Sequence, residues 1–308
     1  MKMDEAAKLE NLQTTIKLNP KNFQARRELI MLCLDLGFEK TALYHIDYLL
    51  KIFPDDSNLY YNKGICAEKL KDTTCALLSY QKAVELKNDD PDYLYNLALL
   101  QEETGDIDSA MANLKKVIYY KNEDANAFFS IGILYSKKND STTAIKCFKK
   151  AIELNYSDYF SHFYLAGEYK KIGDSTNALV EYKKVLELSC DYSWAYYNIA
   201  QIYFEQGRIT DCITMLRKTI EKNPGDIDAI KLLAQILINE NNSDKALALL
   251  SKKVEKYPTG DFYYLMAKCF SLIEDYPSAK NCLELSLNNP QSLSYNYKAV
   301  EQEYKEIG

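Results

Sequence analysis

Apolar residues along this chain recur at steps of three and four, which is the spacing of one face of an α-helix. In residues 125–158, one apolar stripe contains Phe128, Ile131, Leu134 and Tyr135. The polar pair Asn139-Asp140 interrupts this stripe. A second stripe follows the interruption and contains Ala144, Ile145, Phe148, Ala151 and Ile152. The pattern predicts two amphipathic helices joined by a tight turn.

The same pattern repeats along the chain with a period of 34 residues. One series of small residues at this interval is Ala42, Ala76, Ala110, Ala144, Ala178, Cys212 and Ala246. A second series is Gly64, Ala98, Gly132, Ala166, Ala200 and Ala234. At Gly132 and Ala144 we expect the two helices of a pair to cross closely, because larger side chains would push the backbones apart. The polar break, whose residues end one helix and cap the next, recurs at Gly105-Asp106, Gly173-Asp174, Gly207-Arg208 and Asn241-Asn242.

The repeated unit resembles the tetratricopeptide repeat family. Residues 57–90 match the family signature closely, at Tyr60, Gly64, Ala76, Tyr80 and Ala83. The resemblance covers nearly the whole chain. It implies an all-α fold, a right-handed superhelical solenoid of about eight helix-turn-helix units with a C-terminal cover helix.

We predict one solenoid over residues 1–308, with a partial repeat at 1–22 and a cover helix at 294–308. The full repeats are predicted at 23–56, 57–90, 91–124, 125–158, 159–192, 193–226, 227–259 and 260–293. Acidic residues close most of them, and each precedes a predicted helix. We expect their carboxylates to cap main-chain N–H groups at Asp55-Asp56, Asp89-Asp90, Glu123-Asp124, Asp158, Asp191 and Asp226.

In this family the first helix of each repeat lines the concave surface, and its fifth residue usually points into the groove. The resemblance therefore places five consecutive aromatic residues along the groove, Tyr61, Tyr95, Phe129, Phe163 and Tyr197. The alternative is that these rings pack against the neighbouring repeat. The sixth positions include Asn62, Asn96 and Asn198. An asparagine side chain can donate and accept, which suits the main chain of an extended peptide, although ordinary groove polarity is the alternative.

Two further aromatic residues, Phe160 and Trp194, occupy second positions that are polar in most other repeats. We expect Phe160, Phe163, Trp194 and Tyr197 to converge between the fifth and sixth repeats. Such a cluster on a polar ridge is a candidate anchor for a peptide partner. The alternative is that neighbouring helices bury it.

A subgroup of the family clamps the C-terminal carboxylate of heat-shock chaperones with basic residues. Arg27 and Asn62 match two parts of that clamp, but Asp92 and Asn96 stand where the basic pair belongs. Because Asp92 would repel a carboxylate, chaperone-tail binding is not expected. The pair Lys170-Lys171 lies at the end of a first helix, where it favours the negative end of the helix dipole. Binding of a phosphate or an acidic partner is the alternative for these lysines.

The composition and the absence of known motifs argue against several classes of function. The formal charge is −6, so a nucleic acid is not expected as the main partner. Two histidines and eight cysteines without a CxxC pair do not indicate a metal or redox site. The chain contains no glycine-rich phosphate loop, no HExxH and no GxSxG. We therefore predict a protein that is not an enzyme and that needs no metal and no cofactor.

The sequence thus predicts a scaffold that binds a peptide segment or a folded partner protein in its concave groove. The alternative is a structural assembly subunit that associates with itself. The N-terminal residues have no apolar core typical of a signal peptide, and no apolar run approaches the 18 residues of a membrane span. We therefore expect a cytoplasmic protein without membrane insertion.

Overall fold

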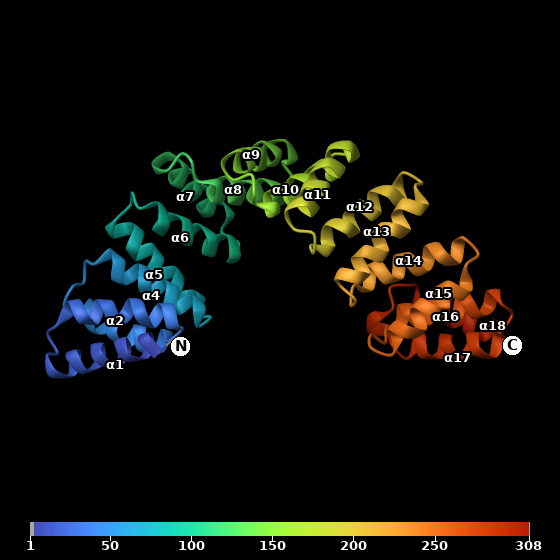
Figure 1. Cartoon of the computed structure of the whole chain (residues 1–308), viewed down its shortest axis with the longest axis horizontal. Coiled ribbons are helices and arrows are strands. Elements are labelled where there is room, and N and C mark those ends of the chain that lie inside the picture. The colour runs from blue at the N-terminus through green and yellow to red at the C-terminus, as the bar shows by residue number, and fades with distance from the viewer. Residues whose placement is uncertain (1–2, 308) are drawn as a thin grey trace. The chain divides into compact units, whose positions relative to one another are not determined.

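The computed structural model describes residues 3–307, and this part of the chain contains eighteen α-helices, one short 3-10 helix and no strand (Figure 1). The predicted all-α fold class is confirmed. The helices are α1 (Met3–Leu18), α2 (Phe23–Leu36), α3 (Glu39–Leu50), α4 (Ser57–Lys69), α5 (Thr73–Leu86), α6 (Pro91–Glu103), α7 (Ile107–Tyr120), α8 (Ala125–Lys137), α9 (Ser141–Leu154), α10 (Tyr159–Lys171), α11 (Ser175–Leu188), α12 (Ser193–Glu205), α13 (Ile209–Lys222), α14 (Ile227–Asn239), α15 (Ser243–Val254), α16 (Gly260–Leu272), α17 (Tyr276–Leu287), η1 (Pro290–Ser292) and α18 (Tyr297–Glu306).

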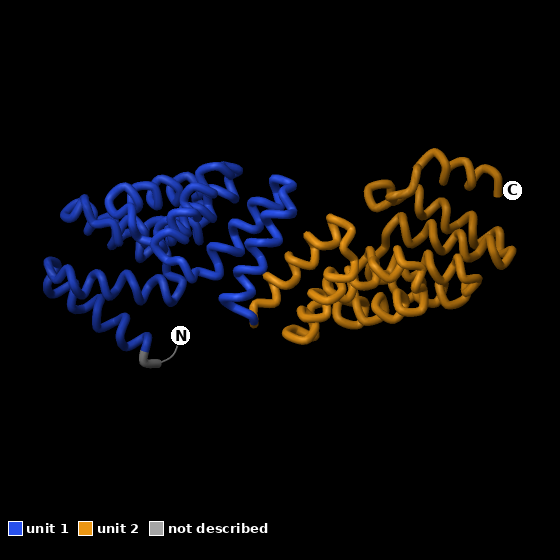
Figure 2. The backbone as a smooth tube through the Cα atoms, turned by 90° about the horizontal axis from the view of Figure 1, so that it is seen from above, with its two compact units in different colours: residues 1–156 blue, residues 157–308 orange. Residues whose placement is uncertain are grey.

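The helices form two compact units, residues 1–156 and residues 157–308 (Figure 2). In the first unit, α4 packs mainly against α5, α6 against α7, and α8 against α9. The second unit has the same pairwise order in α10 with α11 and α12 with α13. In that unit α14 also contacts α16, the first helix of the next pair. The helices with even numbers from α2 to α16 are therefore the first helices of successive pairs.

Aspartates cap most of the first helices, as the sequence predicts. The Asp56 carboxylate accepts the main-chain N–H of Leu59 at 3.2 Å. The same cap occurs at Asp90, Asp124, Asp158 and Asp226. The prediction is wrong for Asp191, because α12 begins one residue later and has Tyr192 at its N-cap without a side-chain cap. Asp191 instead forms an ion pair with Lys222, with 2.7 Å between the carboxylate oxygen and the ammonium nitrogen.

The predicted breaks inside the pairs are confirmed as turns with one residue at positive φ. This residue is Gly105, Asn139, Gly173, Gly207 or Asn241. Glycine and asparagine tolerate this left-handed conformation better than other residues do. Each turn therefore ends a first helix and leads directly to the second helix of its pair.

Small residues on one helix of a pair leave room for a large aromatic ring from the other helix. Ala144 is fully buried. A Cβ atom added at Gly132 would lie 2.6 Å from the ring of Phe148, and one at Gly64 would lie 2.4 Å from the ring of Tyr80. The close crossing predicted at Gly132 thus has a defined cause, because the neighbouring helix places an aromatic ring over this glycine.

All eight cysteines are free, and five of them are buried. Burial raises the pKa of the Cys66 thiol to about 12 and that of Cys212 to about 11. Cys190 is exposed. Within residues 3–307, no helix combines the length and the apolar character that crossing a membrane requires.

We expect iodoacetamide at pH 8 to modify Cys190 before any buried cysteine of the folded protein. Only the thiolate reacts, and a thiol with a pKa of about 12 is roughly one part in ten thousand thiolate at pH 8. Peptide mass mapping over time measures the order of modification. All eight cysteines react in denaturant, which is the control. Native-state modification of Cys66 at the rate of Cys190 would contradict the burial described here.

Candidate functional site

In the first unit, the predicted groove residues Tyr61 and Asn96 contact each other. The Asn96 side-chain amide donates to the Tyr61 hydroxyl at 2.7 Å and to the Asp92 carbonyl at 3.1 Å. The Tyr61 ring stacks on Tyr93 of the next repeat, with 4.7 Å between the ring centroids. Burial raises the pKa of Tyr61. Tyr61 therefore links two repeats, and it remains only half-buried.

Asn62 lies beside Tyr61 on a groove of about 380 Å³ in the first unit. Its amide points at the sulfur of Met31, at 3.9 Å. Arg27 and Asp92 also line this groove. The Arg27 guanidinium is paired with the Asp56 carboxylate. This ion pair and the exposed Asp92 leave no basic pair for a carboxylate clamp at these positions.

Tyr95 and Phe129 are the other aromatic residues predicted for this unit, and both are half-buried. The Tyr95 hydroxyl lies 3.3 Å from the Ser130 hydroxyl of the next repeat. The Phe129 ring lies 5.7 Å from the ring of Phe148, between centroids. These rings have packing partners, as the alternative interpretation expects, and each keeps a part of its surface open to solvent.

In the second unit, Phe160 and Phe163 belong to a cluster of six aromatic rings, with Tyr159, Tyr164, Tyr182 and Tyr192. Both contact Tyr192, at 6.0 Å and 5.1 Å between centroids, and Phe160 also stacks on Tyr159 at 4.3 Å. Among the described residues, the ring contacts of this cluster do not include Trp194 or Tyr197. Tyr192 is the residue that the sequence interpretation missed. Its signal was an aromatic residue at the position where five other repeats have a capping aspartate.

Trp194 is the most exposed of the predicted aromatic residues, at 52%, and Phe160 is 43% exposed. The Asn198 amide donates to the Trp194 carbonyl at 2.9 Å. Tyr197 is half-buried and lines a groove of about 280 Å³ together with Lys170. Trp194, Tyr197 and Asn198 therefore all lie on α12 with at least part of their surface exposed.

A groove of about 630 Å³ lies on the face formed by the first helices α12, α14 and α16. Its apolar lining includes Phe204, Leu232 and Leu272, and its polar lining includes Gln235 and Lys268. No predicted site residue belongs to it. The available signal was Leu232 and Leu265, which are apolar at the sixth position where three earlier repeats have asparagine.

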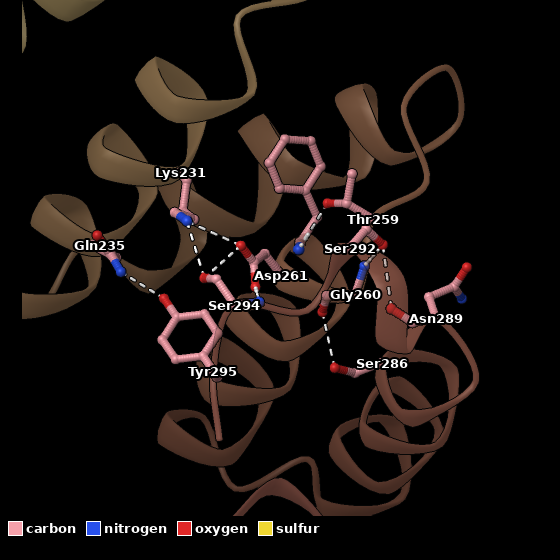
Figure 3. Close-up of polar contacts among 11 residues, drawn as sticks. Lys231, Gln235, Thr259, Gly260, Asp261, Ser286, Asn289, Ser292, Ser294 and Tyr295 are labelled. Carbon is pink, nitrogen blue, oxygen red and sulfur yellow. Dashed lines mark hydrogen bonds and ion pairs between the residues drawn. The ribbon is translucent and has the colours of Figure 1, made fainter. Parts of the chain in front are cut away.

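The chain itself lies against one end of this face. We call residues 290–296, between α17 and α18, the strap. The Ser294 main-chain N–H donates to the Asp261 carboxylate at 2.6 Å, and the Ser294 hydroxyl donates to it at 2.8 Å. Lys231 donates to both Asp261 and Ser294, at 3.0 and 3.1 Å. The Gln235 amide donates to the Tyr295 hydroxyl (Figure 3).

The N-terminus of α16 completes this contact. The Gly260 N–H donates to the Ser292 hydroxyl at 2.8 Å, and the Gly260 carbonyl accepts the Ser286 hydroxyl at 2.8 Å (Figure 3). A Cβ atom at Gly260 would lie 2.6 Å from the carbonyl oxygen of Asn289, just before the strap, and 2.9 Å from the Cβ atom of Leu293 in the strap. Only glycine therefore lets the strap approach α16 this closely.

The side chains of these surfaces can form apolar contacts and hydrogen bonds with another molecule. The surfaces offer apolar side chains, amides, hydroxyls and lysines. Among residues 3–307, no group of three or more His, Cys, Asp or Glu residues could hold a metal ion. The buried His162 contacts Glu181 at 2.7 Å, on the second helix of its own pair.

Sequence models of known families match most of this chain. Tetratricopeptide repeat models match residues 57–90, 91–124, 125–158, 194–226 and 211–269, and a TPR repeat model matches 166–207. Together these matches cover more than half of the chain. The chain belongs to the tetratricopeptide repeat family, whose fold serves as a scaffold for protein–protein interaction.

Solved structures support the same fold. A tetratricopeptide repeat protein from Parabacteroides merdae aligns with 82% of this chain and 98% of its own, at 16% identity and a TM-score of 0.56. The C-terminal part of a TPR protein from Cytophaga hutchinsonii aligns with 74% of this chain and 93% of its own, at 17% identity and a TM-score of 0.61. YrrB, a TPR protein with an unusual peptide-binding site, aligns with 60% of this chain and 95% of its own, at 21% identity and a TM-score of 0.52. No curated protein sequence matches this chain.

Proposed function

We propose that this chain is a non-catalytic cytoplasmic scaffold, a single solenoid that binds a peptide segment or a folded partner protein on the face of its first helices. The predicted contact residues are Tyr61, Asn62, Tyr95, Asn96, Phe129, Phe160, Phe163, Trp194, Tyr197 and Asn198. The strap carries the proposal most strongly. Its non-helical residues 293–296 follow the short helix η1, and the first-helix face contacts them through Lys231, Gln235 and Asp261.

The strap supports the proposal because it uses the chemistry that a peptide partner needs. The Asp261 carboxylate accepts a hydrogen bond from the main-chain N–H of Ser294, and the Gln235 amide donates one to the Tyr295 hydroxyl. Tyr264 packs on the Tyr295 ring at 4.3 Å between centroids. Beside the strap, the same face has open apolar surface at Phe204 and Leu272. The peptide-binding site named for YrrB, which shares the fold, agrees with this interpretation.

We expect the double variant Trp194→Ala, Tyr197→Ala to lose at least about 90% of partner capture from native lysate. Aromatic residues at binding hot spots contribute about 2 kcal/mol or more when truncated. Quantitative mass spectrometry of the captured proteins measures the loss, and circular dichroism checks the fold. Tyr276→Ala is the matched control, because Tyr276 on the second helix α17 is 53% exposed and Trp194 is 52% exposed.

Unchanged capture by the folded double variant would contradict the role of these two residues. The alternative function is self-assembly, and light scattering tests it. A concentration-dependent oligomer of the wild type together with no captured partner would overturn the scaffold proposal in favour of a structural assembly subunit.

A further inference from the structure

The two grooves of the second unit are continuous. Phe204, Leu232 and Gln235 line both the groove of about 630 Å³ and the groove of about 280 Å³. Tyr295 of the strap lines one end of the combined surface, and Lys170 of α10 lines the other. A binding surface therefore extends over four first helices, from α10 to α16. We call it the second-unit groove.

Lys170 is the unusual residue of the second-unit groove. Its ammonium donates to the side-chain oxygens of Gln201 at 2.6 Å and Asn198 at 3.4 Å. Burial lowers the pKa of Lys170, and the charge of nearby Glu205 offsets part of this effect. No carboxylate within the described residues forms an ion pair with it. A lysine ammonium has three N–H donors, so it can still donate to a bound anion.

The other two lysines of the groove already have carboxylate partners. Lys231 pairs with Asp261 at 3.0 Å, and Lys268 pairs with Glu303 at 2.9 Å. Removing a cation from bulk water costs free energy, and an anionic oxygen offsets that cost better than an amide oxygen does. Among these three lysines, Lys170 is thus the one that can bind a partner's carboxylate without breaking an existing ion pair, beside the carboxylates of Glu205 and Asp228.

The carboxylates of Glu205 and Asp228 line the same end of the groove as Lys170, and the rest of the lining combines polar side chains with exposed apolar ones. Phe204 is 44% exposed and Leu272 is 57% exposed. Leu232 lies on α14, between the helices that carry these two residues. An extended peptide advances about 3.3 Å per residue, so a segment of roughly nine residues is about 30 Å long.

We propose that the second-unit groove binds an extended peptide segment with an Asp or Glu side chain at Lys170 and apolar side chains on Phe204, Leu232 and Leu272. This inference rests on the proposed scaffold function and specifies the chemistry of its partner. The acid is a side chain within the segment, so binding requires no free C-terminus.

A peptide array tests the inference on the full chain. It carries nine-residue peptides with C-terminal amides. One position among the three residues at either end is Glu, Gln or Lys, and the other positions are varied among Leu, Phe and polar residues. We expect Glu peptides with apolar neighbours to bind the wild type about tenfold more tightly than their Gln counterparts. Lys170→Gln abolishes this preference and Lys170→Arg retains it.

Lys184→Gln is the matched control, because it removes the same charge from the second helix α11, where Lys184 pairs with Glu187. It should leave the preference unchanged. Equal binding of Glu and Gln peptides, or binding that requires a free C-terminus, overturns the assignment to Lys170 and leaves the scaffold function standing. If Phe204→Ala and Leu272→Ser leave peptide binding unchanged, or if the array retains no peptide, the scaffold function in this groove is overturned as well.

Discussion

Asp261→Ala is expected to lower the free energy of unfolding of the second unit by about 3 kcal/mol, the low end of the cost of breaking a buried ion pair. The low end applies because the Lys231 side chain keeps 23% of its surface exposed, whereas Asp261 keeps 6%. The substitution leaves a mostly buried ammonium without its carboxylate. It also leaves the Ser294 N–H and hydroxyl without their acceptor. The strap should therefore detach from α16.

Chemical denaturation measures the stability, and hydrogen exchange at the Ser294 amide reports directly on the strap. Ser294→Ala keeps the Lys231–Asp261 pair and should cost about 1 kcal/mol. Glu284→Ala on α17 changes an exposed carboxylate and should have little effect. An Asp261→Ala protein with native stability and a protected Ser294 amide would show that these hydrogen bonds do not hold the strap.

The helix pairs could be predicted because their determinants repeat. Glycine or asparagine at positive φ ends the first helices at Gly173 and Asn139, and both residues already stood out as breaks in the apolar pattern. Asp56 and Asp124 cap helices through main-chain groups only three residues away. Local chemistry of this kind is visible in the sequence, since donor and acceptor lie close together along the chain.

The strap and the second-unit groove could not be predicted in this way. Asp261 stands at the second position of its repeat, where Asp92 and Asp228 also stand, and nothing local distinguishes it. Its partner Ser294 is 33 residues later, in a segment that interrupts the repeat pattern. Lys170 was interpreted as a charge at a helix end, but its environment comes from Gln201 on the next first helix. Contacts between repeats depend on three-dimensional packing rather than on the period.

The second large effect is a reversal of sign at Gly132. Phe148→Ala should lower the free energy of unfolding of the first unit by about 3–5 kcal/mol, because the ring is fully buried. In the wild type, Gly132→Ala places a Cβ atom 2.6 Å from this ring and should cost about 1–3 kcal/mol through overpacking. In the Phe148→Ala background the ring is gone. Gly132→Ala should then stabilise by up to about 1 kcal/mol, the helix propensity gained over glycine.

A double-mutant cycle by urea denaturation measures this reversal, and Gly167→Ala provides the matched control. Gly167 is also a helical glycine, but a Cβ atom there meets no atom closer than 3.9 Å. It should therefore stabilise the protein in either background by up to about 1 kcal/mol. If Gly132→Ala has the same effect with and without the Phe148 ring, the ring does not select for glycine. A sign reversal that is confined to Gly132 would instead assign the period-34 series of small residues to aromatic packing between paired helices, because helix propensity alone treats Gly132 and Gly167 alike.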